Sequence, residues 1–402
     1  MIMDLRYSGY PVRIHSGTDS LKRLDSELNR LNSNRAMIVC GRSIANKTNL
    51  IDRIKSVCEP SSRIACVFDK AETSSPLPSV MEGVQLAKEN NIDCIVSVGG
   101  GSSIVTTRGI LILLAEQGTA FDLCTQYPPG QRPISPRLDE EKLPTISVIT
   151  TPTTATNRSG TALKDPETRT RLELFDPKTR PIAVIWDKEA LETASPQLTK
   201  SASASLLTGV LAGLLSKNLN HLALSDLNGA LEIMLHDLPL VDTMQSYGEV
   251  AMKLCAASFL YNRACDSGIG GTALGVVSAI SHAIDTKFPD CSHGDAYSVM
   301  TSHGISFNGP AILESSARVL ASLERFNAND IPMSGDAAGR LSEWSLRFFQ
   351  SIDMPTKLSS IGVTDQDINA IARDAMEDFP MHSNIRRVEN IEEIESLLSS
   401  AL

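Results

Sequence analysis

The sequence predicts an α/β domain built on a parallel sheet, followed by an all-helical domain. Three observations support this fold class: strand and helix patterns alternate in the first half, a glycine turn follows an apolar strand directly, and small-residue segments with helical spacing begin near residue 188. Apolar runs separated by helices of about a dozen residues indicate parallel βαβ units. We therefore expect an α/β domain at residues 1–187 and a helical substrate domain at 188–402.

The strands of the first half are apolar runs that end in turn residues. We expect strands within residues 35–44, 62–69, 93–103, 145–165 and 181–187. The helices between them show apolar positions at helical spacing. We expect these helices within residues 49–58 and 78–91, the second with a proline near its start and polar residues at its end.

The second half is predicted to be helical throughout. Its helix-period segments are residues 195–217, 250–265, 271–284, 315–326 and 388–402. Ligands of open α/β sheets bind outside the carboxyl ends of the strands, so we expect the ligand cleft between the two halves. The proline-rich residues 125–144 are an exposed loop, either a plain connection or a lid over that cleft.

Composition narrows the class of partner. The net charge is −10 and no long Lys/Arg run occurs, so nucleic acid is not expected as a partner. The N-terminus lacks the apolar core of a signal peptide, and the sequence contains no apolar run long enough to cross a bilayer. The eight cysteines form no CxxC pair, which is typical of reduced thiols in a cytoplasmic protein and disfavours a zinc–cysteine site.

The glycine turn is the strongest functional pattern. Gly99, Gly100 and Gly101 follow a strand and precede a helix, and Ser102 adds a hydroxyl donor. Glycine lets the backbone approach a diphosphate, and the start of the helix presents unpaired N–H groups to it. A tight turn without a ligand is the alternative, but the flanking strand and helix favour a nucleotide.

Three segments resemble one enzyme family: "SVGGGSS" at the turn, "TTPTTATNRSG" at 150–160, and the stretch from "SAISH" to "SHGD". They are similar to the iron-containing, group III alcohol dehydrogenases, which share a fold with dehydroquinate synthase and include maleylacetate reductases. The resemblance covers nearly the whole chain. It implies an N-terminal Rossmann-like domain that binds NAD or NADP and a C-terminal helical domain.

The resemblance also assigns the cofactor residues. It matches the diphosphate turn to Gly99, Gly100, Gly101 and Ser102, and the second cofactor segment to Thr151, Thr153 and Thr154. NAD-preferring members often carry an Asp after the strand at 35–44, whereas this chain has Gly41, Arg42 and Ser43. Because a guanidinium suits a 2′-phosphate, we favour NADP over NAD, with a solvated turn as the alternative for Arg42.

A divalent metal held by one Asp and three His is implied by the resemblance, but its ligands are mostly absent. The first two positions fall on Ser205 and Gly209 or, in another register, on Leu211 and Leu215. The third falls on Ser278 and the fourth on His293. A hard divalent cation needs several anionic or imidazole donors, so we expect no catalytic metal.

The chain also departs from the family's other motifs. In the GGGSxxDxxK pattern, Val105 replaces the Asp and Arg108 the Lys. In the PTTAGTGSE pattern, Gly160 replaces the final Glu and Arg158 is gained. These changes are consistent with another substrate or with an abandoned activity.

The remaining catalytic candidates are His282 and His293, since imidazoles titrate near neutral pH and both match family positions in the cleft. Lone histidines are often core residues, which is the alternative for each. Arg158 and Arg108 can replace the charge of the metal by polarising a carbonyl or binding a carboxylate. We expect Asp290 and Asp295 to lie in a solvated loop rather than to orient an imidazole or bind a cationic group, and the other five histidines to be structural or exposed.

The predicted function is a metal-independent NAD(P)-dependent alcohol dehydrogenase or carbonyl reductase acting on a small-molecule or natural-product substrate. One alternative is a cofactor-binding pseudoenzyme or scaffold that supports a partner enzyme. A lyase or cyclase of the dehydroquinate synthase kind is weaker, since it also normally needs a metal. Relatives are commonly dimers, so we expect a homodimer.

Overall fold

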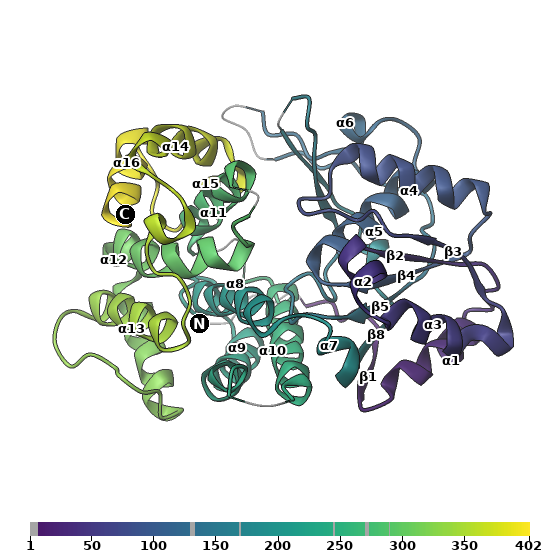
Figure 1. The fold of residues 1–402 in the computed structure, drawn as a ribbon. Helices are drawn as coiled ribbons and strands as arrows, with labels where there is room; N and C mark the ends of the chain where they lie inside the picture. Colours follow the sequence, from purple (N-terminus) through teal and green to yellow (C-terminus); the bar gives the residue numbers. More distant parts are fainter. Residues whose placement is uncertain (1–6, 129–132, 169, 244–245, 270–272, 289) are drawn as a thin grey trace. The chain divides into compact units, whose positions relative to one another are not determined.

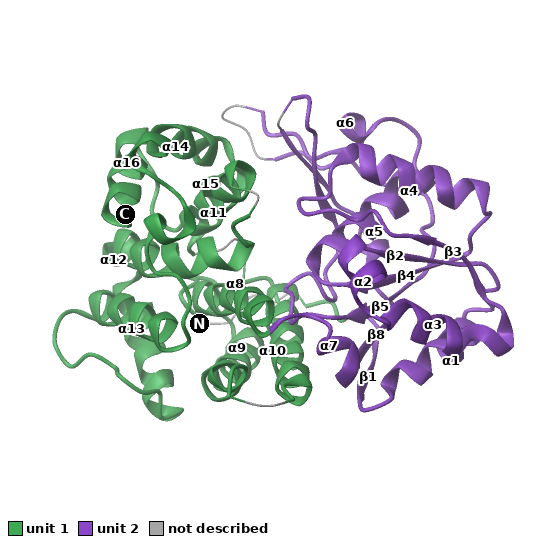
Figure 2. Ribbon diagram, in the orientation of Figure 1, with its two compact units in different colours: residues 1–9, 196–402 green, residues 10–195 purple. Residues whose placement is uncertain are grey.

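The structure is a computed structural model that describes residues 7–128, 133–168, 170–243, 246–269, 273–288 and 290–402. The described chain divides into two compact units, residues 10–195 and residues 7–9 with 196–402 (Figure 2). The first unit ends at Ser195, whereas the sequence places the boundary after residue 187. Every helix in the described part of the chain is too short or too polar to cross a lipid bilayer.

A six-stranded, all-parallel sheet forms the first unit, in the order β1-β8-β5-β4-β2-β3 (Figure 1). Its strands are β1 (Arg13–Gly17), β2 (Ala36–Cys40), β3 (Ile64–Phe68), β4 (Cys94–Gly99), β5 (Thr145–Ile149) and β8 (Ala183–Asp187). The chain passes from β2 outward to β3 and then returns to the other side of β2 to form β4. The strand order therefore reverses between β2 and β4, where open α/β sheets bind their ligands.

Both faces of the sheet are covered by helices, as alternating side chains require. Met37 and Val39 of β2 pack in a core with α4, α5 and α6, whereas Ile38 and Cys40 pack with α1 and α3. The helices of this unit are α1 (Arg23–Arg30), α2 (Arg42–Lys47), α3 (Leu50–Cys58), α4 (Leu77–Glu89), α5 (Gly101–Ala115), α6 (Ala120–Leu123) and α7 (Lys188–Leu191). The predicted α/β domain is confirmed.

An antiparallel hairpin was not expected from the sequence. It consists of β6 (Thr161–Lys164) and β7 (Arg171–Leu174) and follows the threonine-rich loop. The proline-rich loop before β5 is partly ordered by backbone bonds. Gln126 and Ile134 exchange two of them, 2.8 and 2.9 Å long, and Thr125 donates to Glu173 of β7. Residues 129–132, at its centre, lie outside the described residues.

The second unit is helical, as predicted. Its helices are α8 (Pro196–Leu214), α9 (His221–Asp237), α10 (Gly248–Asp266), α11 (Gly275–Lys287), α12 (His293–Arg325), α13 (Ala337–Ser351), α14 (Ile368–Glu377), α15 (Phe379–His382) and α16 (Ile391–Ser400) (Figure 1). The helix expected at 315–326 is only the last part of α12, which runs for 33 residues through Pro310. His293 and Gly294 lie in the first turn of this helix.

Candidate functional site

The glycine turn links β4 to α5 with backbone geometry that a side chain would disturb. Gly99 has a φ of +140°, in a region that L-residues rarely adopt, and a β-carbon there would lie 2.5 Å from Ser103 Oγ. Gly100 is the N-cap of α5, and no side chain caps this helix start. The first N–H groups of α5 are therefore available to an anionic ligand.

Two of the predicted threonines lie against this turn. A β-carbon on Gly100 would lie 2.6 Å from Thr151 Oγ1, and one on Gly101 would lie 3.2 Å from Thr153 Oγ1. The N–H of Thr150 donates to the carbonyl of Gly99 over 3.1 Å, which ties the end of β5 to the turn. Thr154, also predicted for the cofactor, is half-buried farther along the same loop.

The remaining cofactor candidates lie at the neighbouring strand end. Gly41 is the N-cap of α2, and Arg42 and Ser43 are exposed in its first turn, directly after β2. Because β2 and β4 are adjacent parallel strands, their carboxyl ends lie at the same edge of the sheet. The predicted diphosphate turn and the predicted 2′-phosphate residues thus flank the point where the strand order reverses.

Arg108, considered as a substrate-binding cation, is instead a buried structural residue. Its side chain is 3% exposed and donates to the backbone carbonyls of Ala155 and Gly160. Burial and the nearby guanidinium groups of Arg158 and Arg180 lower the pKa of Arg108. It therefore holds the loop at 150–160, and of the two proposed arginines only half-buried Arg158 remains a catalytic candidate.

Gly160, which stands where the family motif has a Glu, lies at a sterically crowded position. Gly160 has a φ of +79°, and a β-carbon there would lie 2.9 Å from the carbonyl oxygen of Leu174. This approach follows from the hairpin, in which Thr161 pairs with Leu174. A glutamate side chain has no room at this position in this chain.

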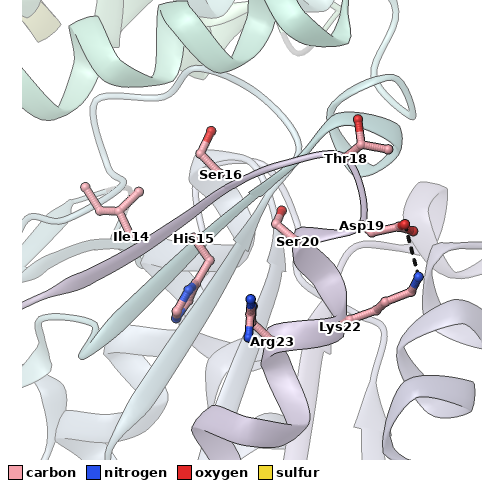
Figure 3. A pocket seen from close by; sticks show the side chains of 8 residues that line it. All are labelled: Ile14, His15, Ser16, Thr18, Asp19, Ser20, Lys22 and Arg23. Atoms are coloured by element: carbon pink, nitrogen blue, oxygen red, sulfur yellow. Dashed lines mark ion pairs between the residues drawn. The ribbon is translucent and has the colours of Figure 1, made fainter.

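A cavity of about 640 Å³ lies at the end of β1 (Figure 3). Its lining residues are Ile14, His15, Ser16, Thr18, Asp19, Ser20, Lys22 and Arg23. His15 bonds to buried Glu27 over 2.9 Å, and Lys22 pairs with Asp19 over 3.0 Å. Strands β8 and β5 separate β1 from β4, so this cavity is distinct from the glycine turn.

His282 and His293, the two histidines that the sequence offers as catalytic candidates, lie together in the second unit. Their rings stack with centroids 5.6 Å apart and an angle of 16° between planes. His282 Nδ1 lies 2.5 Å from a carboxylate oxygen of Asp378, and His293 Nδ1 bonds to Asp285. The side chain of His282 is 14% exposed and that of His293 46%, so the pair has a buried and an open member.

A close backbone contact holds the helix that carries His293. A β-carbon on Gly294, next to His293, would lie 1.7 Å from the carbonyl oxygen of Ser201 in α8. The hydroxyls of Ser201 and Ser292 are 2.6 Å apart at the same contact. The start of α12 is therefore placed directly on the backbone of α8, which fixes the position of His293.

Asp295, expected in a solvated loop, is instead half-buried in the first turn of α12. Burial raises its pKa, an effect that Asp285 reinforces and that hydrogen bonds from Ser292 and Ser201 oppose. The expectation failed because Gly294 brings this turn against α8. Asp290, the other acid of that prediction, is exposed, as expected.

Comparison with known proteins identifies the family of this chain. Residues 11–188 match the model of the iron-containing alcohol dehydrogenases, and residues 229–402 match the C-terminal model of the same family. The chain belongs to the iron-containing alcohol dehydrogenase family. It is therefore an oxidoreductase of a family that uses NAD or NADP and acts on CH–OH groups.

Individual relatives of this family are distant but full-length. The NAD-dependent methanol dehydrogenase of Bacillus methanolicus is 24% identical over 96% of this chain and 97% of its own. The structure of a 1,3-propanediol oxidoreductase superposes with a TM-score of 0.84 at 21% identity, over 99% of this chain and all of that one. The structure of sulfoacetaldehyde reductase from Bifidobacterium kashiwanohense, solved with NAD⁺, superposes with a TM-score of 0.80 at 16% identity. The match covers 100% of this chain and 99% of that one.

The metal of the iron-containing alcohol dehydrogenases does not fit the residues of this chain. In one register, Ser205 bonds to the carbonyl of Ala202 in its own helix, and the Tyr261 ring lies 2.7 Å from where a β-carbon of Gly209 would be. In the other register, both positions are fully buried leucines, Leu211 and Leu215. Among the described residues, no group of three or more His, Cys, Asp or Glu side chains is arranged to hold a metal ion.

Sequence reasoning missed the carboxylates that hold the two histidines. Asp285 lies three residues after His282 on α11, a helical spacing that the sequence already contains. Asp378 lies 96 residues away, between α14 and α15, and only the packing of the second unit brings it to His282. No local pattern identifies such a partner.

Proposed function

We propose that this protein is a metal-independent, NAD(P)-dependent alcohol dehydrogenase or carbonyl reductase. It transfers a hydride between the nicotinamide and an alcohol, aldehyde or ketone. The substrate is a small molecule or a natural product. The stacked pair of His282 and His293 carries the proposal, because it supplies two imidazoles for proton transfer, while three of the family's four metal positions, all but that of His293, hold Ser278 and small or apolar residues. We also propose that the protein is a homodimer.

The first unit provides the nucleotide site. The uncapped start of α5 offers N–H groups to the diphosphate, and the hydroxyls of Thr151 and Thr153 border the glycine turn. When bound, the nicotinamide donates or accepts the hydride. The chain's own task at this edge is to bind and orient the nucleotide.

The second unit provides the proton. In the reducing direction a protonated imidazolium donates a proton to the substrate oxygen and becomes neutral, and in the oxidising direction a neutral imidazole nitrogen accepts that proton and becomes imidazolium. The hydride and this proton together convert a carbonyl to an alcohol. Arg158 remains a candidate for polarising that oxygen, a role that the family gives to the metal.

Arg42 supports NADP as the preferred cofactor. Its guanidinium is exposed at the end of β2, beside the strand that carries the glycine turn. We expect Arg42→Ala to weaken NADPH binding about tenfold or more and to leave NADH binding nearly unchanged, since only NADPH carries the 2′-phosphate. Fluorescence titration of both nucleotides measures this ratio, and equal losses for both would exclude the assignment.

Metal dependence and turnover are tested on the same purified protein. We expect metal analysis to find no stoichiometric iron or zinc, and chelator-treated protein to oxidise NADPH with some member of an aldehyde and ketone panel. Stoichiometric metal that is required for turnover would contradict metal independence. Tight nucleotide binding without turnover on the panel, together with a co-purifying enzyme, would favour the cofactor-binding scaffold instead.

A further inference from the structure

We infer that Asp378 and Asp285 are positioning residues, which fix the ring orientation and the tautomer of His282 and His293. This role rests on the proposed function, because it matters for catalysis only if the histidines exchange a proton with the substrate. Both carboxylates approach the same ring atom, Nδ1, of their partner. Each histidine is thus bound at its Nδ1 atom by a different carboxylate.

The contact determines the tautomer because an ionised carboxylate only accepts hydrogen bonds. The proton of each neutral imidazole must then lie on Nδ1, which leaves the Nε2 atom as the base. Both carboxylates are well shielded from water, with side chains 11% exposed for Asp378 and 14% for Asp285. Water therefore competes little for either bond.

Asp378 is anchored to the helix that carries His282 by contacts other than the imidazole. A β-carbon on Gly275, at the start of α11, would lie 2.1 Å from the carbonyl oxygen of Pro380. The N–H of Val276 donates to Asn384 Oδ1 over 3.1 Å, and Asn384 donates in turn to Asn308 Oδ1 in α12 over 2.8 Å. The segment after Asp378 is thereby packed on α11 and α12, so the carboxylate is in place before any substrate arrives.

Asp285 lies on the same helix as His282, α11. Residues three apart on a helix lie on one face, so α11 presents His282 and Asp285 toward the start of α12. There His293 stacks on His282 and is oriented by Asp285. Rotation of either ring would break both the stack and an Nδ1 bond, and for this reason we treat the four side chains as one unit.

The test compares Asp378→Asn and Asp285→Asn with Asp226→Asn as a matched control. Asp226 is also about 10% exposed in the same unit, but it pairs with Arg263 rather than with a histidine. We expect kcat to fall about 10- to 100-fold in Asp378→Asn, as for orienting partners of other functional histidines. The fall is smaller for Asp285→Asn, whose histidine is more exposed, and KM for the nucleotide is unchanged. Asp378→Glu, which keeps the carboxylate, restores part of kcat.

A spectroscopic readout tests the geometry without turnover. In protein with ¹⁵N-labelled histidine, long-range ¹H–¹⁵N correlations report the tautomer of each ring, and the His282 signals are assigned by their loss in His282→Ala. We expect the proton on Nδ1 of His282 in the native chain and in Asp226→Asn, and a mixed or reversed tautomer in Asp378→Asn.

Two results would overturn the inference: a proton on Nε2 of His282 in the native chain, or an unchanged tautomer and kcat in Asp378→Asn. The proposed function fails differently. If the native chain binds the nucleotide without turnover on the panel, that function is lost, while the tautomer of His282 in Asp378→Asn still decides whether the carboxylate orients the ring.

Discussion

The glycine turn at 99–102 and the histidine pair at 282 and 293 both carry proposed site residues, but they depart from the family motifs to different degrees. The glycine turn keeps the family residues and is made largely of backbone: the φ of Gly99 and the uncapped start of α5. At the histidine pair the helices still meet through Gly294 and Ser201, but the side chains at most metal positions have changed.

This difference shows which parts of a site can change without loss of the fold. A site made of closely approaching backbone, such as the glycine turn, tolerates no added β-carbon, so the fold itself constrains its sequence. A side-chain site needs only helices at fixed positions, and one set of side chains can replace another there. The following predictions test this contrast, from the largest expected effect to the smallest.

Replacing His282 tests whether the side-chain site is catalytic. We expect His282→Ala to lower kcat about 10²- to 10⁴-fold, the usual contribution of a general acid or base, with unchanged nucleotide binding. His382→Ala is the control, because this histidine is exposed at the end of α15. Steady-state kinetics and nucleotide titration give the comparison, and equal kcat in both variants would show that the histidine pair is only structural.

Gly294→Ala tests whether the helices of the second unit depend on close backbone contact. The new β-carbon would lie 1.7 Å from the Ser201 carbonyl, so we expect a loss of about 3 kcal/mol in the free energy of unfolding. Gly309→Ala, on the same helix, adds a β-carbon 3.5 Å from Ala338 Cβ, an ordinary contact. Since alanine favours a helix over glycine, that variant should gain about 0.5–1 kcal/mol. Urea unfolding measures both, and equal values would contradict the packing argument.

Gly100→Ala tests the glycine turn. A β-carbon there would lie 2.6 Å from Thr151 Oγ1 and would occupy space next to the proposed diphosphate position. We therefore expect the nucleotide Kd to rise about tenfold, which is a loss of about 1.4 kcal/mol in binding free energy. The double variant Gly100→Ala with Thr151→Ala removes the crowding but keeps the added carbon. Recovery of affinity in the double variant would show that the threonine clash, rather than the lost approach to the ligand, weakens binding.

The smallest effect is expected at Glu27, away from both sites. Burial raises the pKa of Glu27, but bonds from Arg13 and His15 lower it by more, so the net shift is downward. Its contribution to stability is therefore present above the unfolded-state pKa of about 4.3 and is lost as the pH falls through the folded-state value. We expect Glu27→Gln to lose about 1–2 kcal/mol at pH 7, with the difference narrowing below about pH 4.

The control for that change is Glu82→Gln, since Glu82 and Lys70 form an exposed pair. Exposed pairs contribute about 0–1 kcal/mol, so this variant should unfold like the native chain at every pH. Urea unfolding at several pH values measures both variants. A Glu27→Gln deficit that stays constant down to pH 3 would contradict the direction of the pKa shift.

Much of the fold follows from local sequence patterns. The central strands β2, β4, β5 and β8 are rich in apolar residues and buried at every position, because a parallel sheet is covered on both faces. The edge strand β1 was missed because "RIHSG" is half polar, and the hairpin because its strands have only four residues each. The length of α12 was underestimated because Gly294, Gly304 and Pro310 interrupt its helical pattern.

The candidate site was predictable only where its residues act locally. The glycine turn lies next to its own strand and helix, and the threonines of the loop after β5 follow from the family resemblance. The burial of Arg108 and Asp295 depends on distant carbonyls and on the contact of α12 with α8, which no local pattern reports. The pairing of Asp378 with His282 likewise depends on packing across 96 residues.

The Tyr261 ring beside Gly209 bears on any attempt to engineer a metalloenzyme from this chain. If the first register holds, an imidazole introduced at Gly209 alone would collide with an aromatic ring whose nearest atom is 2.7 Å from the new β-carbon. The designer would have to shrink Tyr261 in the same step and then supply the Asp and the remaining His. A single substitution at Gly209 therefore does not supply this ligand unless the Tyr261 ring moves.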